Sequence, residues 1–256
     1  MNFAPFAFQN SAPVAGIVTT NLVLNYDAGN TSSYPGTGTT WSNLQPTSIN
    51  STLTNGPTFS TNNGGTIVFD GTNDFTTAAN NAIFDFGSGD FTLEAWVKIN
   101  GNSGLNNSGV RDATILSCFT TSGAVPNAWN LQFDASSTTT GTGLRLQKYA
   151  SSVVQDIQVS FTFTQGVFYQ VGVTRRGATT RLFINGTEYT PGINLSGNVN
   201  SGGNAFKIST LGYAGYLHYL NGTVGIVRIY KGTGLTAAEI TQNYNANSNR
   251  IWWMKI

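Results

Sequence analysis

A sugar-cleaving enzyme acts through carboxylate side chains. The strand-like run at 91–99 that could carry them here contains a single one, Glu94. Retaining hydrolysis of a glycosidic bond uses two carboxylates that lie about 5 Å apart. On one strand such a pair would occupy alternate positions, so that both side chains face the same cleft. The segment TLEAW at 92–96 contains one acid, Glu94, with no second acid at an alternate position. The sequence therefore predicts no catalytic residues and a protein that is not an enzyme.

Oxygen-bearing side chains are closest together in the segment FDGTNDF at 69–75. Calcium binds about six to eight oxygen atoms from carboxylates, amides and backbone carbonyls. Asp70, Asn73 and Asp74 are the best candidates for such a site, and Asp27 in NYDAG is a further candidate. The same residue types also favour a turn in which Asp and Asn bond the backbone. The sequence favours the turn and keeps Ca²⁺ as the alternative.

Aromatic residues gather in the stretch LGYAGYLHY at 211–219. A sugar site combines an aromatic ring, which contacts C–H faces, with polar groups that bond hydroxyls. The sequence therefore predicts a glycan-binding rim formed by Trp129, Asn130, Tyr213, Tyr216, His218 and Tyr219. The alternative is a strand whose tyrosines pack beneath a loop. His218, the single histidine, is expected to be hydrogen-bonded or exposed rather than catalytic.

Cysteine usage excludes an intramolecular disulfide, because Cys118 is the single cysteine of the chain. A catalytic thiol would need a base nearby, and the chain offers one histidine. Cys118 lies in the strand-like run ATILSCF, which predicts a small buried thiol.

Side-chain alternation is clearest in the run FTLEAWVKI at 91–99. Phe91, Leu93, Ala95, Val97 and Ile99 share one face, and Thr92, Glu94, Trp96 and Lys98 share the other. This period of two is typical of a half-buried antiparallel strand. In a later run Ile226 and Val227 are adjacent, so one of them is expected under a loop or on the second face of its strand.

Strand-like runs follow one another at short spacing. They are expected at 21–27, 66–70, 73–78, 90–99, 112–119, 128–134, 143–149, 152–160, 167–176, 179–185, 187–190, 204–212 and 222–231. Asn-Gly pairs at 55–56, 100–101, 185–186 and 221–222 favour the positive φ angles of type I′ hairpins. Many short strands without intervening helices indicate an all-β antiparallel sandwich.

One short C-terminal helix is expected at 236–246. Thr236 and Glu239 are spaced as a capping box, in which each side chain bonds the backbone N–H of the other residue. Ile240 and Tyr244 then share one face of the helix.

Composition limits the partners of the protein. Charged residues make up 9% of the chain against a usual ~25%, and the net charge is +1. Nucleic-acid binding requires clustered cations, and the longest cationic run is the pair Arg175-Arg176. No stretch approaches the ~20 apolar residues of a membrane helix. Neither nucleic acid nor membrane insertion is expected, whereas abundant Thr, Asn, Ser and Gly suit an external β-surface.

The two ends of the chain carry aromatic residues that could anchor it. Residues 1–20 are interpreted as an arm and 248–256 as a tail around a single domain at 21–247. The anchor candidates are Phe3, Phe6, Phe8, Trp252 and Trp253. Aromatic side chains are costly to expose, so each end should pack on its own domain or on a partner subunit. The start, MNFAPFAFQNS, lacks the basic and apolar regions of a signal peptide.

Four segments that together span most of 21–247 carry a family resemblance. They are NLVLNYDAGNTSSYPGTGTTW, IVFDGTNDF with DFTLEAWVK, FYQVGVTRRGATTRLFINGTEY and TVGIVRIYKGTGLTAAEITQNYNA. Their order and spacing resemble the laminin-G-like branch of the concanavalin A-like lectin/glucanase jelly rolls. The resemblance implies two curved antiparallel sheets packed face to face, of the kind found in phage and bacterial surface proteins. Relatives often carry an acid before their last strand motif, where this chain has Gly225-Ile226-Val227-Arg228.

Three functions are compatible with these observations. The first is a non-catalytic structural or display protein of a virion, such as a capsid decoration or a tail-fibre component. It would lie at the virion surface or outside the cell, with other assembly subunits as partners and host polysaccharide as a further ligand. The second is a free carbohydrate-binding lectin module. A glycoside hydrolase is the least favoured.

Overall fold

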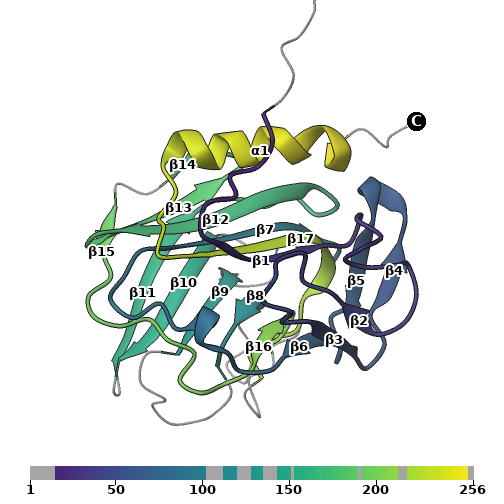
Figure 1. The fold of residues 1–256 in the computed structure, drawn as a ribbon, viewed down its shortest axis with the longest axis horizontal. Helices are drawn as coiled ribbons and strands as arrows, with labels where there is room; N and C mark the ends of the chain where they lie inside the picture. Colours follow the sequence, from purple (N-terminus) through teal and green to yellow (C-terminus); the bar gives the residue numbers. More distant parts are fainter. Residues whose placement is uncertain are drawn as a thin grey trace, which may run out of the picture.

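The computed structural model describes residues 15–101, 112–119, 128–134, 143–150, 153–189, 192–212 and 218–252. Its strands form two antiparallel sheets that pack face to face, with one helix on the outside (Figure 1). The prediction of an all-β sandwich with one C-terminal helix is confirmed. Among the described residues, no helix combines the length and the apolar character needed to cross a membrane.

Sheet A has nine strands, and its main path runs β14-β13-β12-β7-β17-β5-β4. β1 pairs with β17 and β15 pairs with β13 beside this path. The strands are β1 (Leu22–Asp27), β4 (Thr58–Ser60), β5 (Thr66–Asp70), β7 (Phe91–Ile99), β12 (Phe168–Arg176), β13 (Thr179–Ile184), β14 (Thr187–Glu188), β15 (Ile193–Asn194) and β17 (Asn221–Lys231).

Sheet B has eight strands in the order β11-β10-β9-β8-β16-β6-β3-β2. The strands are β2 (Thr40–Trp41), β3 (Ser51–Thr54), β6 (Phe75–Ala78), β8 (Ala113–Ser117), β9 (Trp129–Asp134), β10 (Gly143–Ala150), β11 (Val153–Ser160) and β16 (Phe206–Ile208). Two short 3₁₀ helices, Asn62–Gly64 and Ala82–Phe84, connect strands. Strands β2, β3, β4 and β15 were not expected from the sequence, because they are short and most of them are built from Thr and Ser rather than an apolar alternation.

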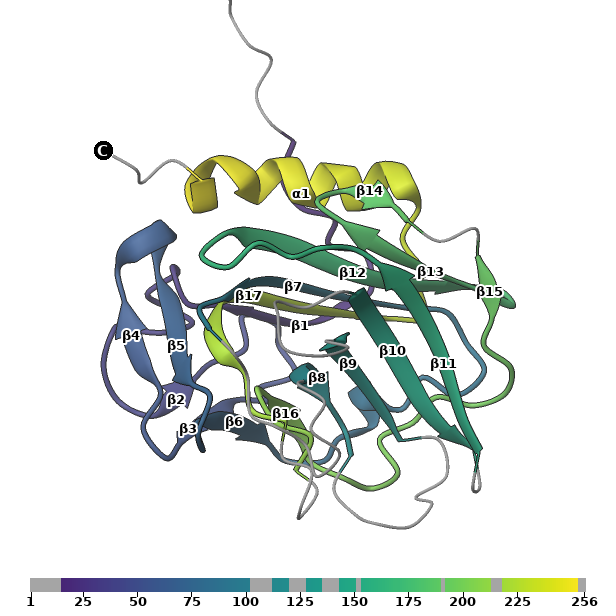
Figure 2. The ribbon, with the colours of Figure 1, turned by 180° about the vertical axis from the view of Figure 1, so that it is seen from behind.

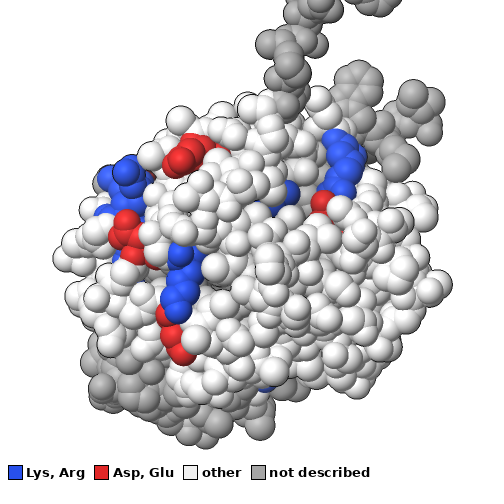
Figure 3. Space-filling view, viewed as in Figure 1, with Lys and Arg blue, Asp and Glu red and all other residues white. Residues whose placement is uncertain are grey.

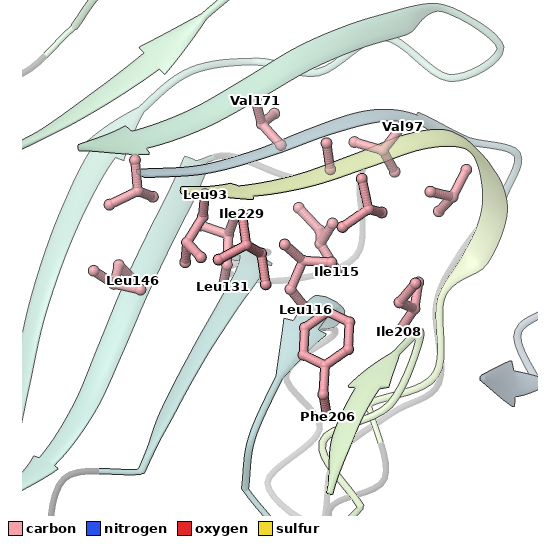
Figure 4. Close-up of a cluster of buried hydrophobic side chains, with 14 of the residues drawn as sticks. Leu93, Val97, Ile115, Leu116, Leu131, Leu146, Val171, Phe206, Ile208 and Ile229 are labelled. Carbon is pink, nitrogen blue, oxygen red and sulfur yellow. The ribbon is translucent and has the colours of Figure 1, made fainter. Parts of the chain in front are cut away.

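The inner faces of the two sheets form one hydrophobic core (Figure 4). Sheet A contributes Leu93 and Val97, and sheet B contributes Leu131 and Phe206, all 0% exposed. Burial of each such side chain is worth roughly 1.5–3 kcal/mol. Cys118 belongs to this core as a free cysteine, so the prediction of a buried thiol is confirmed.

A β-bulge at Gly225 changes which residues of β17 face the core. The register between β17 and β7 shifts between Val224 and Ile226. Val224 and Val227 lie in the main core, whereas Ile226 packs outside it against Ile251. One extra residue in a strand reverses its alternation. The adjacent Ile226 and Val227 are therefore buried on opposite faces of β17, one of the two arrangements that the sequence allowed.

Helix α1 (Ala237–Trp252) covers the outer face of sheet A (Figures 1 and 2). The expected capping box is present: Glu239 N donates to Thr236 Oγ1 at 3.2 Å, and Thr236 N donates to Glu239 Oε2 at 2.8 Å. The helix continues past its expected end at residue 246, because Ile251 is buried against Trp96. The boundary expected at 247 therefore falls inside α1.

Strand β7 differs from the half-buried strand that its alternation predicted. Thr92, Glu94 and Trp96, on the side away from the core, are at most 1% exposed. The cause is α1, whose Tyr244 ring stacks on Trp96 with ring centroids 5.4 Å apart. The alternation shows that one face of β7 is polar. It does not show that another element, here α1, covers that face with polar residues of its own.

The Asn-Gly pairs divide into two groups. Asn55-Gly56 and Asn185-Gly186 adopt positive φ at both residues, as expected for type I′ turns. Asn100-Gly101 has no positive φ, and Asn221-Gly222 opens β17 instead of forming a turn. Asn221 pairs with Asp70 of β5, so sheet pairing decides its conformation.

Charged groups are sparse on the face shown in Figure 3, where cationic groups mostly lie beside acidic ones. Within the described ranges the ion pairs are Arg145–Asp156, Arg181–Glu188 and Arg250–Asp27.

Candidate functional site

The outer face of sheet B carries a patch of polar side chains. In β9 the core residues Leu131 and Phe133 alternate with Asn130 and Gln132, which therefore point away from the core. The same alternation in β10 and β11 turns polar residues outward. We call this patch the polar face, and it comprises Thr114, Ser117, Asn130, Gln132, Arg145, Gln147, Asp156 and Gln158.

Strand register arranges the polar face in two rows across β8, β9, β10 and β11. The first row is Thr114, Gln132, Arg145 and Gln158, each paired with the next. The second row is Ser117, Asn130, Gln147 and Asp156, paired in the same way. Neighbouring strands lie about 4.8 Å apart, a spacing that lets one row of amides and hydroxyls bond several hydroxyls of one saccharide.

Some polar atoms of the polar face are hydrogen-bonded to one another, and others have no partner among the described residues. Asn130 Nδ2 donates to Gln132 Oε1 at 2.6 Å, and Arg145 Nε donates to Asp156 Oδ2 at 2.8 Å. Gln132 Nε2 and Thr114 Oγ1 are buried without a partner in the described structure. A buried polar atom without a partner costs about 1–3 kcal/mol, so a polar ligand that reached these two atoms would gain correspondingly.

Burial changes along the rows. Asn130 and Gln132 are 0% exposed, whereas the side chains of Arg145 and Asp156 are 23% and 39% exposed. The polar face is thus closed at β9, partly exposed at Arg145 of β10 and open to solvent at β11.

Two carboxyl groups meet at one end of the polar face. Ala113 pairs with Phe133, which brings Asp112 beside Asp134. Burial raises the pKa of Asp134, and the nearby Asp112 raises it further. No group of three or more His, Cys, Asp or Glu side chains that could hold a metal ion exists among the described residues.

Trp129 and Asn130 lie in β9 rather than at the rim where the sequence interpretation placed them. Trp129 is 0% exposed, its ring packs against Phe86 and Phe206, and its Nε1 donates to the carbonyl of Phe84 at 3.3 Å. Its ring therefore offers no open face to a sugar. Asn130 belongs to the polar face, as described above.

The remaining predicted glycan residues are only partly within the described residues. Tyr213 and Tyr216 lie outside them, and Tyr219 is half-buried. His218 is 9% exposed, and burial lowers its pKa to about 4. Its backbone carbonyl accepts a hydrogen bond from Thr114 N at 2.9 Å, so His218 lies beside the first row of the polar face. Of these predicted residues, Asn130 thus lies in the second row of the polar face and His218 beside the first row, whereas the ring of Trp129 lies in the core.

The FDGTNDF segment forms a turn whose carboxylates bond the backbone. Asp70 Oδ1 accepts from Thr72 N at 2.7 Å, and Asp74 Oδ2 accepts from Asp70 N at 3.1 Å. Hydrogen bonds from the backbone of Thr72 lower the pKa of Asp70. Asn73 contributes its backbone N–H, which donates to Asp70 Oδ1 at 3.3 Å. Asp27 pairs with Arg250 at 2.7 Å instead of joining these carboxylates.

Glu94, the single acid of β7, lies beneath α1 and away from the polar face. It is 1% exposed and accepts hydrogen bonds from Gln170 and Asn243. Its carboxylate is therefore enclosed by protein groups.

The predicted anchors lie mostly outside the described residues. This holds for Phe3, Phe6, Phe8 and Trp253, and Trp252 is described only as the last residue of α1. The described end of the arm packs on its own domain: Val18 N donates to Asn243 Oδ1 at 2.8 Å, and Ile17 contacts the cluster around Leu235.

Comparison with protein families gives one match, which describes the concanavalin A-like lectin/glucanase superfamily and covers residues 69–241. Comparison with curated proteins finds no match.

Solved structures with a similar fold include three carbohydrate-related proteins. Domain 4 of an extracellular arabinanase from Geobacillus stearothermophilus, in complex with arabinotriose, matches with TM-score 0.61 and 15% identity over 88% of this chain and 98% of that domain. Botulinum neurotoxin type C, which depends on two ganglioside molecules to enter cells, matches with TM-score 0.64 and 10% identity over 89% of this chain. A Trypanosoma rangeli sialidase with a bound inhibitor matches with TM-score 0.60 and 14% identity over 92% of this chain.

These identities are low, so the likenesses show the fold alone. The chain spans 51% of the neurotoxin chain and 34% of the sialidase, but nearly all of the arabinanase domain.

Proposed function

Since this chain belongs to the concanavalin A-like lectin/glucanase superfamily, we propose that it is a non-catalytic display protein of a virion surface that binds polysaccharide through its polar face. Other virion subunits hold it from the opposite side. The polar face supplies amide, hydroxyl and guanidinium groups, which are the groups that recognise sugar hydroxyls. The few charges and many hydroxyl and amide side chains support an external surface.

The observation that carries this proposal is the placement of two features on opposite sides of the sandwich. The polar face lies on the outer side of sheet B, whereas α1 lies on the outer side of sheet A (Figures 1 and 2). Ala15, where the described chain begins, lies against α1 and lines a pocket with Gln242 and Asn245. Both ends of the described chain are therefore next to α1, and a subunit held there presents the polar face outward.

A glycan array with the purified full chain tests the binding half of the proposal. Arg145→Ala should weaken binding to any positive glycan at least tenfold, because Arg145 lies centrally in the first row. Arg181→Ala is the matched control, since Arg181 also forms a half-exposed ion pair but belongs to sheet A. If both variants lose glycan affinity equally, or if no glycan on the array binds, the polar face is not the binding site.

Incorporation into particles tests the display half. Chains lacking residues 1–14 or 253–256 should fold and bind glycan but fail to join the assembly. These deletions spare Ile251, the residue of α1 that is buried against Trp96 of sheet A, because its loss would damage the fold. Full incorporation of both shortened chains would leave the second candidate, a free lectin module, as the better description.

A further inference from the structure

The rim of the sandwich beside β15 holds a pocket that is separate from the polar face and from the pocket beside α1. Its volume is about 360 Å³, and its lining includes Ser88, Arg175, Gly177, Asn194, Ser196 and Gly197. Arg175 comes from the end of β12, and Gly177 from the turn that follows it. A pocket of this size holds one monosaccharide unit.

Arg175 forms the floor of this pocket with one donor to spare. It is 1% exposed. Its guanidinium donates from Nε to Gly89 O at 2.8 Å, from Nη1 to Gly197 O at 3.0 Å, and from Nη2 to the carbonyls of Gly87 and Gly89. These bonds use four of its five N–H groups. The remaining N–H, on Nη1, has no partner within the described ranges.

A second buried cation reaches the same loop from β10. Lys148 is 1% exposed, and its Nζ donates to the carbonyl of Ser196. Gly197 has a φ of 73°, and a Cβ on it would lie 3.6 Å from Lys148 Nζ. The ammonium and guanidinium groups therefore both lie against the backbone of residues 196–197.

Among the described residues, Asp90 is the acid whose charge acts on this pair of cations. Burial lowers the pKa of Lys148, and the charge of Arg175 lowers it further. Burial also lowers the pKa of Arg175, and Asp90 partly opposes this. Asp90 Oδ1 also accepts from Gly177 N at 2.7 Å at the edge of the pocket. Two buried positive charges against one carboxylate create a positive potential that low-dielectric surroundings strengthen.

We propose that this rim pocket binds a small oxyanion, the carboxylate or sulfate group of an acidic saccharide. The spare N–H of Arg175 contacts the anion, and Lys148 attracts it from beneath Gly197. The exposed side chains of Ser88, Asn194 and Ser196 bond the ring hydroxyls. The inference goes beyond the proposed function, because it concerns a different site and a charged ligand.

Titrations of the full chain followed by amide NMR shifts test the rim pocket. Sodium sulfate and glucuronate should both shift the amides of Ser88, Gly177, Ser196 and Gly197, and glucose should not. Amide shifts with sulfate but not with glucuronate would indicate a site for the free ion rather than for a saccharide, and would overturn the proposal. Absence of shifts with either anion would overturn it as well. Binding should weaken as salt is added, because screening reduces the attraction.

Two isosteric variants separate the pocket from general charge effects. Asn194→Asp adds a carboxylate to the pocket and should weaken glucuronate binding at least tenfold while leaving Arg175 and its carbonyl partners in place. Asn249→Asp adds the same charge on α1, at another exposed position, and should change nothing. Equal effects of both variants would contradict the proposal. Neutral-glycan binding at the polar face should survive Asn194→Asp, so failure of one site is distinguishable from failure of the other.

Discussion

Asn243 of α1 donates a hydrogen bond of 2.7 Å from its Nδ2 to Oε2 of Glu94 on β7. The other carboxylate oxygen of Glu94 accepts from Gln170 Nε2 at 2.8 Å. Asn243 also accepts from the N–H of Val18 and donates to the hydroxyl of Tyr230. One amide thus joins the arm, the helix and two strands of sheet A around a buried acid.

The stability of the protein should fall as pH rises from about 4.5 to about 7. Burial raises the pKa of Glu94 from 4.5 to about 7, and Arg228 opposes this shift. The folded chain therefore binds a proton in this range that the unfolded chain has lost, so deprotonation favours unfolding. The loss from this group is at most about 3 kcal/mol. Urea unfolding at several pH values should show the slope, and Glu94→Gln should flatten it. The exposed Glu188→Gln is the control, and equal slopes in all three chains would contradict this assignment.

Removal of the Asn243 side chain should destabilise the protein by about 2–4 kcal/mol. Asn243→Ala leaves the N–H of Val18 and one oxygen of buried Glu94 without partners, and each such group is costly. The same change at the exposed Asn249 on the same helix should cost less than about 0.5 kcal/mol. Thermal or chemical unfolding of both variants measures the difference, which should vanish if the helix docks through its apolar residues alone.

Thr236→Ala should lower the free energy of unfolding by about 1 kcal/mol. The change removes the hydroxyl that accepts from Glu239 N at the start of α1. Thr236→Ser keeps a hydroxyl and should restore most of the loss. Comparable instability of the Ser variant would mean that the methyl group, rather than the cap, matters at this position.

Trp129→Ala should destabilise the fold by about 3–5 kcal/mol instead of selectively weakening glycan binding. The ring lies in the core against Phe86 and Phe206, and its loss leaves a cavity. Trp129→Phe keeps part of this packing and should lose less. If Trp129→Ala kept the melting temperature but reduced glycan binding, this prediction would be wrong and Trp129 would belong to a binding site.

The sheet architecture was accessible from the sequence because alternation and turn chemistry are local. TIVFD at 66–70 was predicted with its observed bounds, and the capping box of Thr236 and Glu239 marked the start of α1. The end of α1 was missed because Ile251 is held by Trp96, a contact between distant parts of the chain. Burial of Glu94 was missed for the same reason.

The polar face was missed although its signal is visible in WNLQFD and LRLQ. In both runs polar residues alternate with Leu or Phe, which identifies a strand with one polar side. The alternation does not say that Gln132 and Arg145 pair, and only this register lines up the rows. Trp129 was misplaced because an aromatic beside an amide looks the same in sequence whether its ring faces the core or solvent.

The order of synthesis gives the position of α1 a further meaning. All strands of both sheets in the described chain precede residue 237, so α1 is the last element to be synthesised. Until α1 follows, Trp96, Phe168 and Ile226 form an open apolar patch on sheet A, with Glu94 and Arg228 among them. An intermediate in which the sheets have paired before α1 docks would therefore expose this apolar patch to other chains.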